Sequence, residues 1–257
     1  IYTSTLKSGL DASDFTVFGE LGEYPQIVRC NHCDLIYAYP RDDGSDLEKK
    51  YKDLPVLEYL EEVESRQLIS KKDAQLVESY CKEGRILDIG CSAGIFLSQL
   101  KPHFEKFGIE PSVHAAREAQ RIVSDGQIYN SLFQETSLEG KSFNVITMWD
   151  VIEHVKNPHN LLNTIKKSLK PGGLFFFQTP NVNSLAARIL QEKCNVFDGI
   201  EHVNLFNENN IYTIAKKNRF RVLSVESIIS EIPIISNYLN NDHPYLGISK
   251  EKKILGI

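Results

Sequence analysis

The sequence is poor in cysteine, has no long apolar run and shows no excess of basic residues. Its five cysteines among 257 residues include one close pair, which fits a reducing compartment better than a disulfide framework. No apolar run approaches the length of a transmembrane helix, about 18 residues, and no signal-peptide pattern opens the chain. The formal net charge is −5, so the basic footprint of a nucleic-acid-binding protein is absent. We therefore expect a cytoplasmic protein with no membrane span and no nucleic-acid partner.

The most informative stretch lies at residues 85–97. An apolar run at 86–89 predicts a short, buried parallel strand. Gly90 and Gly94 then predict a tight turn before a helix, an order that brings backbone N–H groups around a ligand. Asp88 lies at the carboxyl end of the strand, where open α/β sheets bind their ligands.

A second predicted strand at 106–110 ends in Glu110, 22 residues after Asp88. A carboxylate at the tip of a second strand is well placed to accept hydrogen bonds from both hydroxyls of a ribose. A dinucleotide site would call for G-x-G-x-x-G, whereas the spacing here is G-x-x-x-G with Ser92 between the glycines. The stretch predicts a ligand with an adenosine-like ribose, and the alternative is an ordinary turn without a ligand.

Strands and helices alternate along most of the chain. The predicted strands lie at 85–89, 106–110, 126–130, 143–150, 174–178 and 221–228. The predicted helices lie at 57–80, 95–101, 113–123, 157–169, 183–191 and 207–218. This alternation predicts an α/β fold, a Rossmann-like doubly wound parallel sheet with helices on both faces. We expect a small N-terminal lobe at 1–56 and the main domain at 57–257.

Five segments, in this order, resemble signatures of the class I S-adenosylmethionine (SAM) methyltransferases. They are Asp88–Gly94 (motif I, with Ser92 in place of a glycine), Trp149–Pro158, Leu169–Leu174, Thr179–Asn181 and Glu201–Phe206. The group resembled holds ubiquinone-biosynthesis O-methyltransferases and zinc-knuckle sugar methyltransferases. The resemblance implies an enzyme that transfers a methyl group from SAM to a small-molecule or carrier-linked acceptor, by O- or C-methylation.

The resemblance also implies which residues contact SAM: Asp88, Gly90, Cys91, Gly94, Glu110, Pro111, Leu132, Phe133, Trp149 and Asp150. The glycine turn approaches the methionine part, and Asp88 reaches its amino group through water. Glu110 takes the ribose, while Leu132 and Phe133 flank the adenine. Trp149 and Asp150 close the pocket, where an aromatic ring attracts the sulfonium. Phe133 and Trp149 are alternatively core residues.

Three residues are candidates for catalysis, His154, Glu201 and His202. Methyl transfer often requires a base that removes a proton from the acceptor, and histidine suits this role near neutral pH. We expect both histidines to lie near the transferred methyl group. A neighbouring carboxylate would orient the base, or the group would bind a metal. Glu153 precedes His154, and adjacent residues of a helix do not face the same way. Alternatively, these residues only cap turns and bond to backbone.

Cys30 and Cys33 form a Cys-x-x-Cys motif that resembles the second half of the zinc knuckle of sugar methyltransferases. Asp34 stands where glycine is usual, and no cysteine or histidine precedes Cys30 in the sequence. Tetrahedral zinc needs four ligands. The open alternatives are a zinc site completed by other residues, a metal-free turn with two thiols, and a redox pair.

Two rival functions remain open from the sequence. One is a NAD-type oxidoreductase, against which the glycine spacing and the lack of a second Rossmann half argue. The other is a SAM-binding protein without catalysis. Replacement of the candidate histidine and glutamate residues would indicate such a protein, but Glu153, His154, Glu201 and His202 are all present. The acceptor and the oligomeric state are not predicted by any motif.

Overall fold

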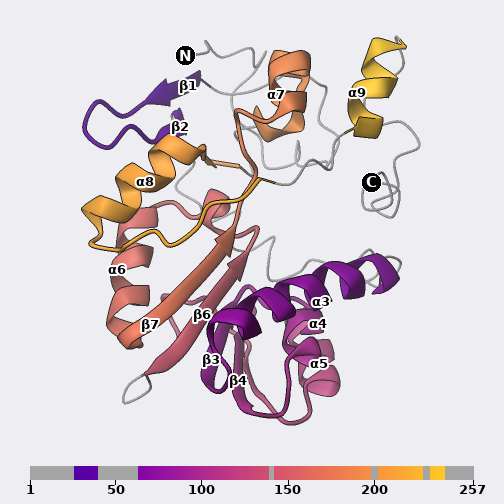
Figure 1. Cartoon of the computed structure of the whole chain (residues 1–257), viewed down its shortest axis with the longest axis vertical. Helices are drawn as coiled ribbons and strands as arrows, with labels where there is room; N and C mark the ends of the chain where they lie inside the picture. Colours follow the sequence, from indigo (N-terminus) through magenta and orange to yellow (C-terminus); the bar gives the residue numbers. More distant parts are fainter. Residues whose placement is uncertain (1–25, 40–62, 139–141, 198–201, 228–231, 241–257) are drawn as a thin grey trace. The chain divides into compact units, whose positions relative to one another are not determined.

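A computed structural model provides the structure of the chain. It describes residues 26–39, 63–138, 142–197, 202–227 and 232–240. The chain divides into two compact units, which are treated separately below (Figure 1). The parallel-sheet unit comprises Ser45–Ile152 and Asn160–Gln178, and the composite unit comprises Ile1–Gly44, Glu153–His159 and Thr179–Ile257.

The parallel-sheet unit contains a five-stranded sheet in the order β5-β4-β3-β6-β7, with every neighbouring pair parallel. Its strands are β3 (Gly84–Ile89), β4 (Phe104–Ile109), β5 (Gln127–Tyr129), β6 (Phe143–Trp149) and β7 (Leu169–Gln178). Its helices are α3 (Val63–Tyr80), α4 (Ile95–Gln99), α5 (Val113–Ile122) and most of α6 (Pro158–Ser168).

The order of the strands reverses between β3 and β6. The chain moves outward from β3 to β4 and β5, then returns to β6 and moves outward again to β7. Because parallel crossovers are right-handed, α4 and α5 cover one face of the sheet and α6 covers the other (Figure 1). A crevice for a ligand is therefore expected at the carboxyl ends of β3 and β6.

Apolar residues explain why β3 lies at the centre of the sheet. Ile86 and Leu87 are fully buried, as are Ile146 and Met148 on the neighbouring β6. A strand buried on both faces needs such a continuous apolar run. One cluster of buried side chains joins this strand to α3, α4 and α5, and its members are Ala74, Val77, Ile86, Cys91, Phe96, Leu97, Leu100, Phe104, Ala119, Val123 and Val145.

The last strand of this sheet differs in detail from the prediction. The predicted strand covers only 174–178, whereas the observed strand runs without a break from Leu169 to Gln178. The register nevertheless shifts there, because Phe143 pairs with Leu169 while Val145 pairs with Leu174. Lys170 to Gly173 thus form an irregular excursion, in which Gly172 has a φ of 77°.

The composite unit is assembled from segments far apart in the sequence. Its antiparallel sheet has the order β1-β2-β8, formed by β1 (Gln26–Arg29), β2 (Ile36–Tyr39) and β8 (Asn204–Leu205). The remaining elements are α7 (Leu185–Leu190), η3 (Gln191–Lys193), η4 (Asn195–Phe197), α8 (Glu208–Lys217) and α9 (Ile232–Leu239). Its core joins the first hairpin to α7 and α9 through Ile27, Ile36, Ala38, Val182, Ala186, Ala187, Leu190, Cys194, Val196, Phe197, Leu205 and Ile235.

The structure confirms the α/β fold and the first five strands of the predicted sheet. A sixth predicted strand at 221–228 is wrong over its described part, since residues 221–227 carry no regular structure. Alternating apolar residues predict that one face of a strand is buried, but they do not show that a neighbouring strand is available to pair with it. Leu223 remains 53% exposed. The predicted boundary between residues 56 and 57 falls outside the described residues and stays a prediction. None of the described helices has the length and apolar character required to cross a bilayer.

Candidate functional site

The glycine turn after β3 has a backbone that only glycine adopts easily. Gly90 and Gly94 have φ of 76° and 77°, in the left-handed region that side chains disfavour. A Cβ on Gly94 would lie 2.8 Å from Val123 Cγ2 and 3.1 Å from Ala119 Cα. The Gly90 N–H donates to the carbonyl oxygen of Ile109 at 2.8 Å. The turn is therefore held against the end of β4.

Glu110 links the glycine turn to the end of β4. The Ser92 N–H donates to Glu110 Oε2 at 2.9 Å, and the Ser112 N–H donates to Oε1 at 2.8 Å. Burial raises the pKa of the Glu110 carboxyl, while the two backbone hydrogen bonds act in the opposite direction. Each oxygen uses one lone pair in these bonds and keeps acceptor capacity. The geometry suits a carboxylate that receives two further hydroxyl donors.

Asp88 is buried near the end of β3, where it accepts a hydrogen bond from Thr147 Oγ1 at 2.8 Å. Burial, together with the nearby charges of Glu110 and Asp73, raises the pKa of Asp88 to about 8. Burial and the charge of Asp150 raise the pKa of Asp73 to about 6. Several carboxyl groups thus act on one another at the carboxyl edge of the sheet, an environment that favours a positively charged ligand.

Sequence reasoning missed Asp73. It lies in the middle of α3, where an aspartate in a helix rich in charged residues carries no distinctive signal. The sequence predicted this helix, but not that one of its carboxyl groups would act on Asp88 across the fold.

Trp149 packs against the core cluster of this unit, whereas Phe133 is buried outside that cluster. The Trp149 ring meets the Phe96 ring edge-on at 5.2 Å between centroids, and Phe133 is buried. The Trp149 indole Nε1 is also buried, and it has no hydrogen-bond partner among the described residues. A buried donor without an acceptor is costly, so this N–H is available to a bound ligand.

The remaining predicted cofactor residues take varied positions. Cys91 is buried, with its side chain in the core cluster. Asp150 is exposed, has a φ of 52°, and accepts from Gln178 Nε2 at 3.1 Å. Leu132 and Pro111 lie in the loops that follow β5 and β4. Their contacts with a cofactor stay predictions.

Within the composite unit, Glu153, His154 and His202 come together. One potential ligand atom from each lies within 4.8 Å of the others, and the two imidazole rings have centroids 5.2 Å apart. Glu153 is buried and accepts from Thr179 Oγ1 at 3.0 Å. Such a set can hold a divalent metal or orient a general base.

The local backbone corrects one expectation about this cluster. Adjacent residues were expected to face apart, yet His154 Nε2 and Glu153 Oε1 are 3.8 Å apart. Both residues lie in a 3-10 turn, η2 (Ile152–His154), rather than in an α-helix. Asn204 Nδ2 holds this turn by donating to the carbonyl oxygen of Val155 at 2.5 Å. The predicted catalytic residue Glu201 lies outside the described residues.

Cys30 and Cys33 lie in the turn between β1 and β2. Backbone N–H groups of Cys33 and His32 donate to the Cys30 sulfur and lower the pKa of its thiol. Burial raises the pKa of the Cys33 thiol. Among the described residues, the one set of three or more metal-binding side chains does not include either cysteine. The described side chains thus offer only two of the four ligands that a tetrahedral zinc site requires. Zinc binding stays a prediction.

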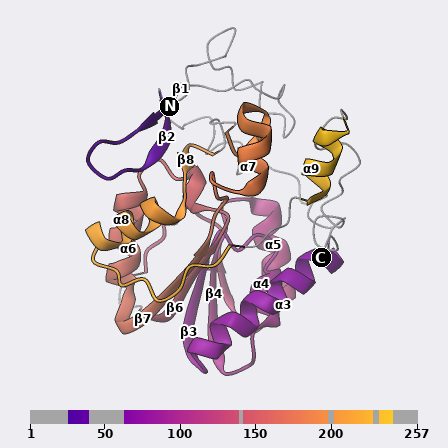
Figure 2. The ribbon, with the colours of Figure 1, turned by 45° about the horizontal axis from the view of Figure 1, so that its top comes forward.

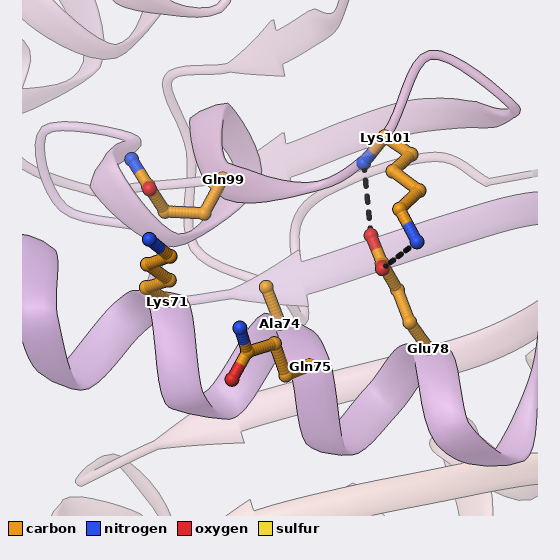
Figure 3. Close-up of a pocket in the computed structure, with 6 residues that line it drawn as sticks. All are labelled: Lys71, Ala74, Gln75, Glu78, Gln99 and Lys101. Atoms are coloured by element: carbon orange, nitrogen blue, oxygen red, sulfur yellow. Dashed lines mark hydrogen bonds and ion pairs between the residues drawn. The ribbon is translucent and has the colours of Figure 1, made fainter.

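A surface pocket of about 230 Å³ lies between α3 and the end of α4 (Figure 3). Its lining consists of Lys71, Ala74, Gln75, Glu78, Gln99 and Lys101. None of these is a predicted site residue. Glu78 accepts from the backbone N–H of Lys101 at 3.0 Å and pairs with Lys101 Nζ at 2.9 Å. The pocket therefore marks where α3 is fastened to α4.

Comparisons with known proteins agree with this geometry. A family model described as "Methyltransferase domain" matches residues 59–225. The ubiquinone biosynthesis O-methyltransferase of Albidiferax ferrireducens is 34% identical over 104 residues, which cover 38% of this chain and 41% of the relative. That of Paracidovorax citrulli is 24% identical over 157 residues, which cover 56% of this chain and 66% of the relative. The matches thus span less than two thirds of these relatives.

A solved structure shares the fold. The plantazolicin methyltransferase BpumL, in complex with a monoazolic desmethylPZN analog and SAH (S-adenosylhomocysteine), superposes with a TM-score of 0.52 at 19% identity. The alignment covers 77% of this chain and 81% of that one. The family match extends over more than half of the chain, and the sheet order agrees with it. The chain belongs to the methyltransferase domain family and has the class I SAM-dependent methyltransferase fold.

Proposed function

We propose that this protein transfers a methyl group from SAM to a small-molecule or carrier-linked acceptor, by O- or C-methylation. The observation that carries the proposal is Glu110, whose two oxygens are fixed by the N–H groups of Ser92 and Ser112 at the edge of the glycine turn. This arrangement suits an adenosine ribose. The family match over residues 59–225 supports the same function.

The cofactor fits the chemistry of this edge of the sheet. SAM carries a sulfonium and an ammonium group, and the carboxyl groups of Asp88 and Glu110 both have pKa values raised by burial. A nearby positive charge favours the ionised form of each. We assign Glu110 to the ribose, Asp88 to the amino group and the backbone of Gly90 to the methionine part. When bound, SAM supplies an electrophilic methyl group.

The side chains at the mouth of the pocket complete the proposed cofactor site. Trp149 places a buried N–H and an aromatic ring at the end of β6, where the ring attracts a sulfonium. Leu132 and Phe133 would flank the adenine, and Pro111 and Asp150 would border it. These contacts would exclude water around the transferred methyl group and align it for displacement.

For catalysis we propose that His154 or His202 accepts the proton of the acceptor, with Glu153 orienting the imidazole. The three side chains lie within ligand distance of one another, and imidazole is basic near neutral pH. We retain Glu201 as a further candidate from the sequence. The same three groups would alternatively hold a divalent ion that polarises the acceptor oxygen.

Titration calorimetry tests the cofactor assignment. We expect SAM and SAH to bind the full chain and NADH not to bind. Glu110→Ala should weaken SAM binding by about 1–3 kcal/mol, because hydrogen bonds to a charged group are lost. Glu105→Ala is the matched control, since Glu105 lies on β4, just before Glu110, is exposed and pairs with Arg85.

Two outcomes would contradict these assignments. Unchanged SAM affinity in Glu110→Ala would remove the ribose role, and tight NADH binding without SAM binding would favour an oxidoreductase. A screen of small phenols, sugars and carrier-linked metabolites with methyl-labelled SAM then identifies the acceptor. SAM binding without transfer to any acceptor of these classes would favour a non-catalytic SAM-binding protein.

A further inference from the structure

The backbone that carries His154 is fixed from β8. Asn204, which is buried on that strand, donates from Nδ2 to the carbonyl oxygens of Glu153 at 3.4 Å and of Val155 at 2.5 Å. These two carbonyl groups flank His154 in the sequence. Strand β8 itself runs beside β2, where Asn204 pairs with Tyr37 (Figure 2). The turn around His154 is therefore held by an element of its own unit, and the freedom that remains lies in the side chains.

The side chain of Glu153 is oriented by Thr179, the residue that follows β7. The Thr179 hydroxyl donates to Glu153 Oε2 at 3.0 Å. Glu153 is only 1% exposed, and a buried carboxylate needs hydrogen bonds to offset its lost hydration. Threonine is branched at Cβ and adopts few rotamers, so its hydroxyl has a well-defined direction. While Oε2 is bonded to Thr179, Oε1 lies 3.8 Å from His154 Nε2.

The two oxygens of this carboxylate thus have different neighbours. Rotation of the carboxyl plane away from its position would break the bond to Thr179 and move Oε1 relative to His154. The same carboxyl group lies within ligand distance of His202. One hydroxyl outside the cluster therefore sets how Glu153 meets the two imidazoles.

We propose that Thr179 is a positioning residue for methyl transfer, because its hydroxyl holds the Glu153 carboxylate in the orientation that serves His154. This inference rests on the proposed function, since it deepens the role of the same cluster. In this role Thr179 acts through Glu153, and it needs no contact with the acceptor or the cofactor. A general base and a metal ligand both depend on such outer hydrogen bonds for their orientation.

Three substitutions separate the hydroxyl of Thr179 from the shape of its side chain. Thr179→Val replaces the hydroxyl by a methyl group, Thr179→Ala removes both branches, and Thr179→Ser keeps the hydroxyl. We expect the first two to lower kcat about 10- to 100-fold, the usual cost of losing an outer hydrogen bond to a functional group. Thr179→Ser should stay within about threefold of the wild-type kcat. KM for SAM should stay within about twofold in all three, since the residues proposed to bind the cofactor belong to the parallel-sheet unit.

Ring-nitrogen NMR of His154 at fixed pH gives a second readout, which needs no acceptor. The Nε2 resonance should shift in Thr179→Val, because Glu153 Oε1 is no longer held beside it, and should keep its wild-type position in Thr179→Ser. The matched control is Thr213→Val, which removes from α8 of the same unit a hydroxyl that bonds to the carbonyl oxygen of Asn209. It should change neither kcat nor the His154 resonance.

Three results would overturn the inference. They are full kcat in both Thr179→Val and Thr179→Ala, an equal loss in Thr179→Ser, which would assign the effect to shape, and a parallel rise in KM for SAM, which would indicate a general structural role. A wild-type chain that methylates no acceptor would instead contradict the proposed function. In that case an unchanged His154 resonance in Thr179→Val would still overturn the positioning role.

Discussion

The two units of this protein differ in how they are built from the chain. In the parallel-sheet unit β3, β4 and β6 are each followed by a crossover helix and then by the next strand, so the carboxyl edge of the sheet consists of short local motifs. The composite unit gathers the hairpin at 26–39, the turn at 153–159 and the segments after residue 179. The first design is readable from local sequence patterns, whereas the second depends on contacts between distant segments.

The units also differ in the chemistry of their polar residues. The parallel-sheet unit collects carboxyl groups whose pKa values are raised mainly by burial, as at Asp73 and Asp88. The composite unit brings together two histidines and one glutamate, His154, His202 and Glu153. We therefore propose that the first unit binds a cationic cofactor and that the second supplies proton transfer or metal binding. The predictions below test this division.

The largest effect is expected in the composite unit. His154→Ala or His202→Ala should slow methyl transfer about 10²- to 10⁴-fold, the usual cost of losing a general base. SAM affinity should stay within about twofold, because the residues proposed to bind the cofactor belong to the parallel-sheet unit. Single-turnover rates with labelled SAM and calorimetry measure the two quantities. His159→Ala is the control, because it removes a histidine of the same unit that pairs with Asn218 and is not part of the cluster of Glu153, His154 and His202.

Full turnover in both histidine variants would show that neither is the base. Treatment with a chelator separates the two uses of the cluster. Loss of turnover that a divalent ion restores would assign the cluster to metal binding. Unchanged turnover would assign it to proton transfer.

The next effect concerns the stability of the glycine turn. Gly94→Ala should lower the free energy of unfolding by about 2–4 kcal/mol, because a left-handed alanine costs about 1–2 kcal/mol and overpacking adds to this. The new Cβ would lie 2.8 Å from Val123 Cγ2. Gly172→Ala is the matched control, since its φ is also 77° but no atom lies within 4 Å of the new Cβ.

Denaturant unfolding of both glycine variants measures the difference. We expect Gly172→Ala to cost only about 1–2 kcal/mol. Equal losses in the two variants would show that close packing at Gly94 does not matter, and that the strain of the backbone alone requires glycine.

A smaller effect, opposite in sign, is expected for Asp88→Asn without cofactor. The raised pKa means that the folded state favours the protonated acid. Below about pH 4 the carboxyl is protonated in both the folded and the unfolded chain, and Asp88 does not destabilise the fold. Between about pH 4 and pH 8 the unfolded chain loses this proton first, so the destabilisation by Asp88 grows. The variant should therefore stabilise the protein by about 1–3 kcal/mol near pH 8 and not near pH 4. It should also weaken SAM binding.

Thermal unfolding across this pH range, with and without SAM, tests the expectation. Glu105→Gln serves as an exposed control on the neighbouring strand. An Asp88→Asn protein that is less stable than the wild type near pH 8 would show that the carboxyl is ionised and well paired without a ligand.

The smallest effect concerns the two cysteines of the hairpin. Because the pKa of the Cys30 thiol is lowered and that of Cys33 is raised, Cys30 should be alkylated faster near neutral pH. Mass spectrometry after brief treatment with iodoacetamide measures the two rates. Protection of both thiols by added zinc, at about one equivalent per chain and lost in Cys33→Ser, would support the zinc prediction.

Sequence patterns predicted the strands and the glycine turn at the carboxyl edge of the sheet, for a local reason. Gly90, Gly94 and Glu110 lie in turns whose shape is set by nearby residues, and the observed strands agree with the alternating pattern. Prediction failed at 221–227, where the apolar alternation found no partner strand. It also failed for the relative orientation of the Glu153 and His154 side chains, because these residues lie in a 3-10 turn and not in the expected α-helix.

The amino-acid sequence by itself determined the α/β fold, the glycine turn and the acidic residue at the end of β4, because these depend on apolar periodicity and on backbone freedom within a few residues. Only the tertiary structure decided that Asp73 acts on Asp88 and that Glu153 meets His202. It also decided that the first hairpin packs with α7 and α9. Such contacts join residues tens of positions apart, and they form because buried surfaces must match in shape and charge, which no local pattern records.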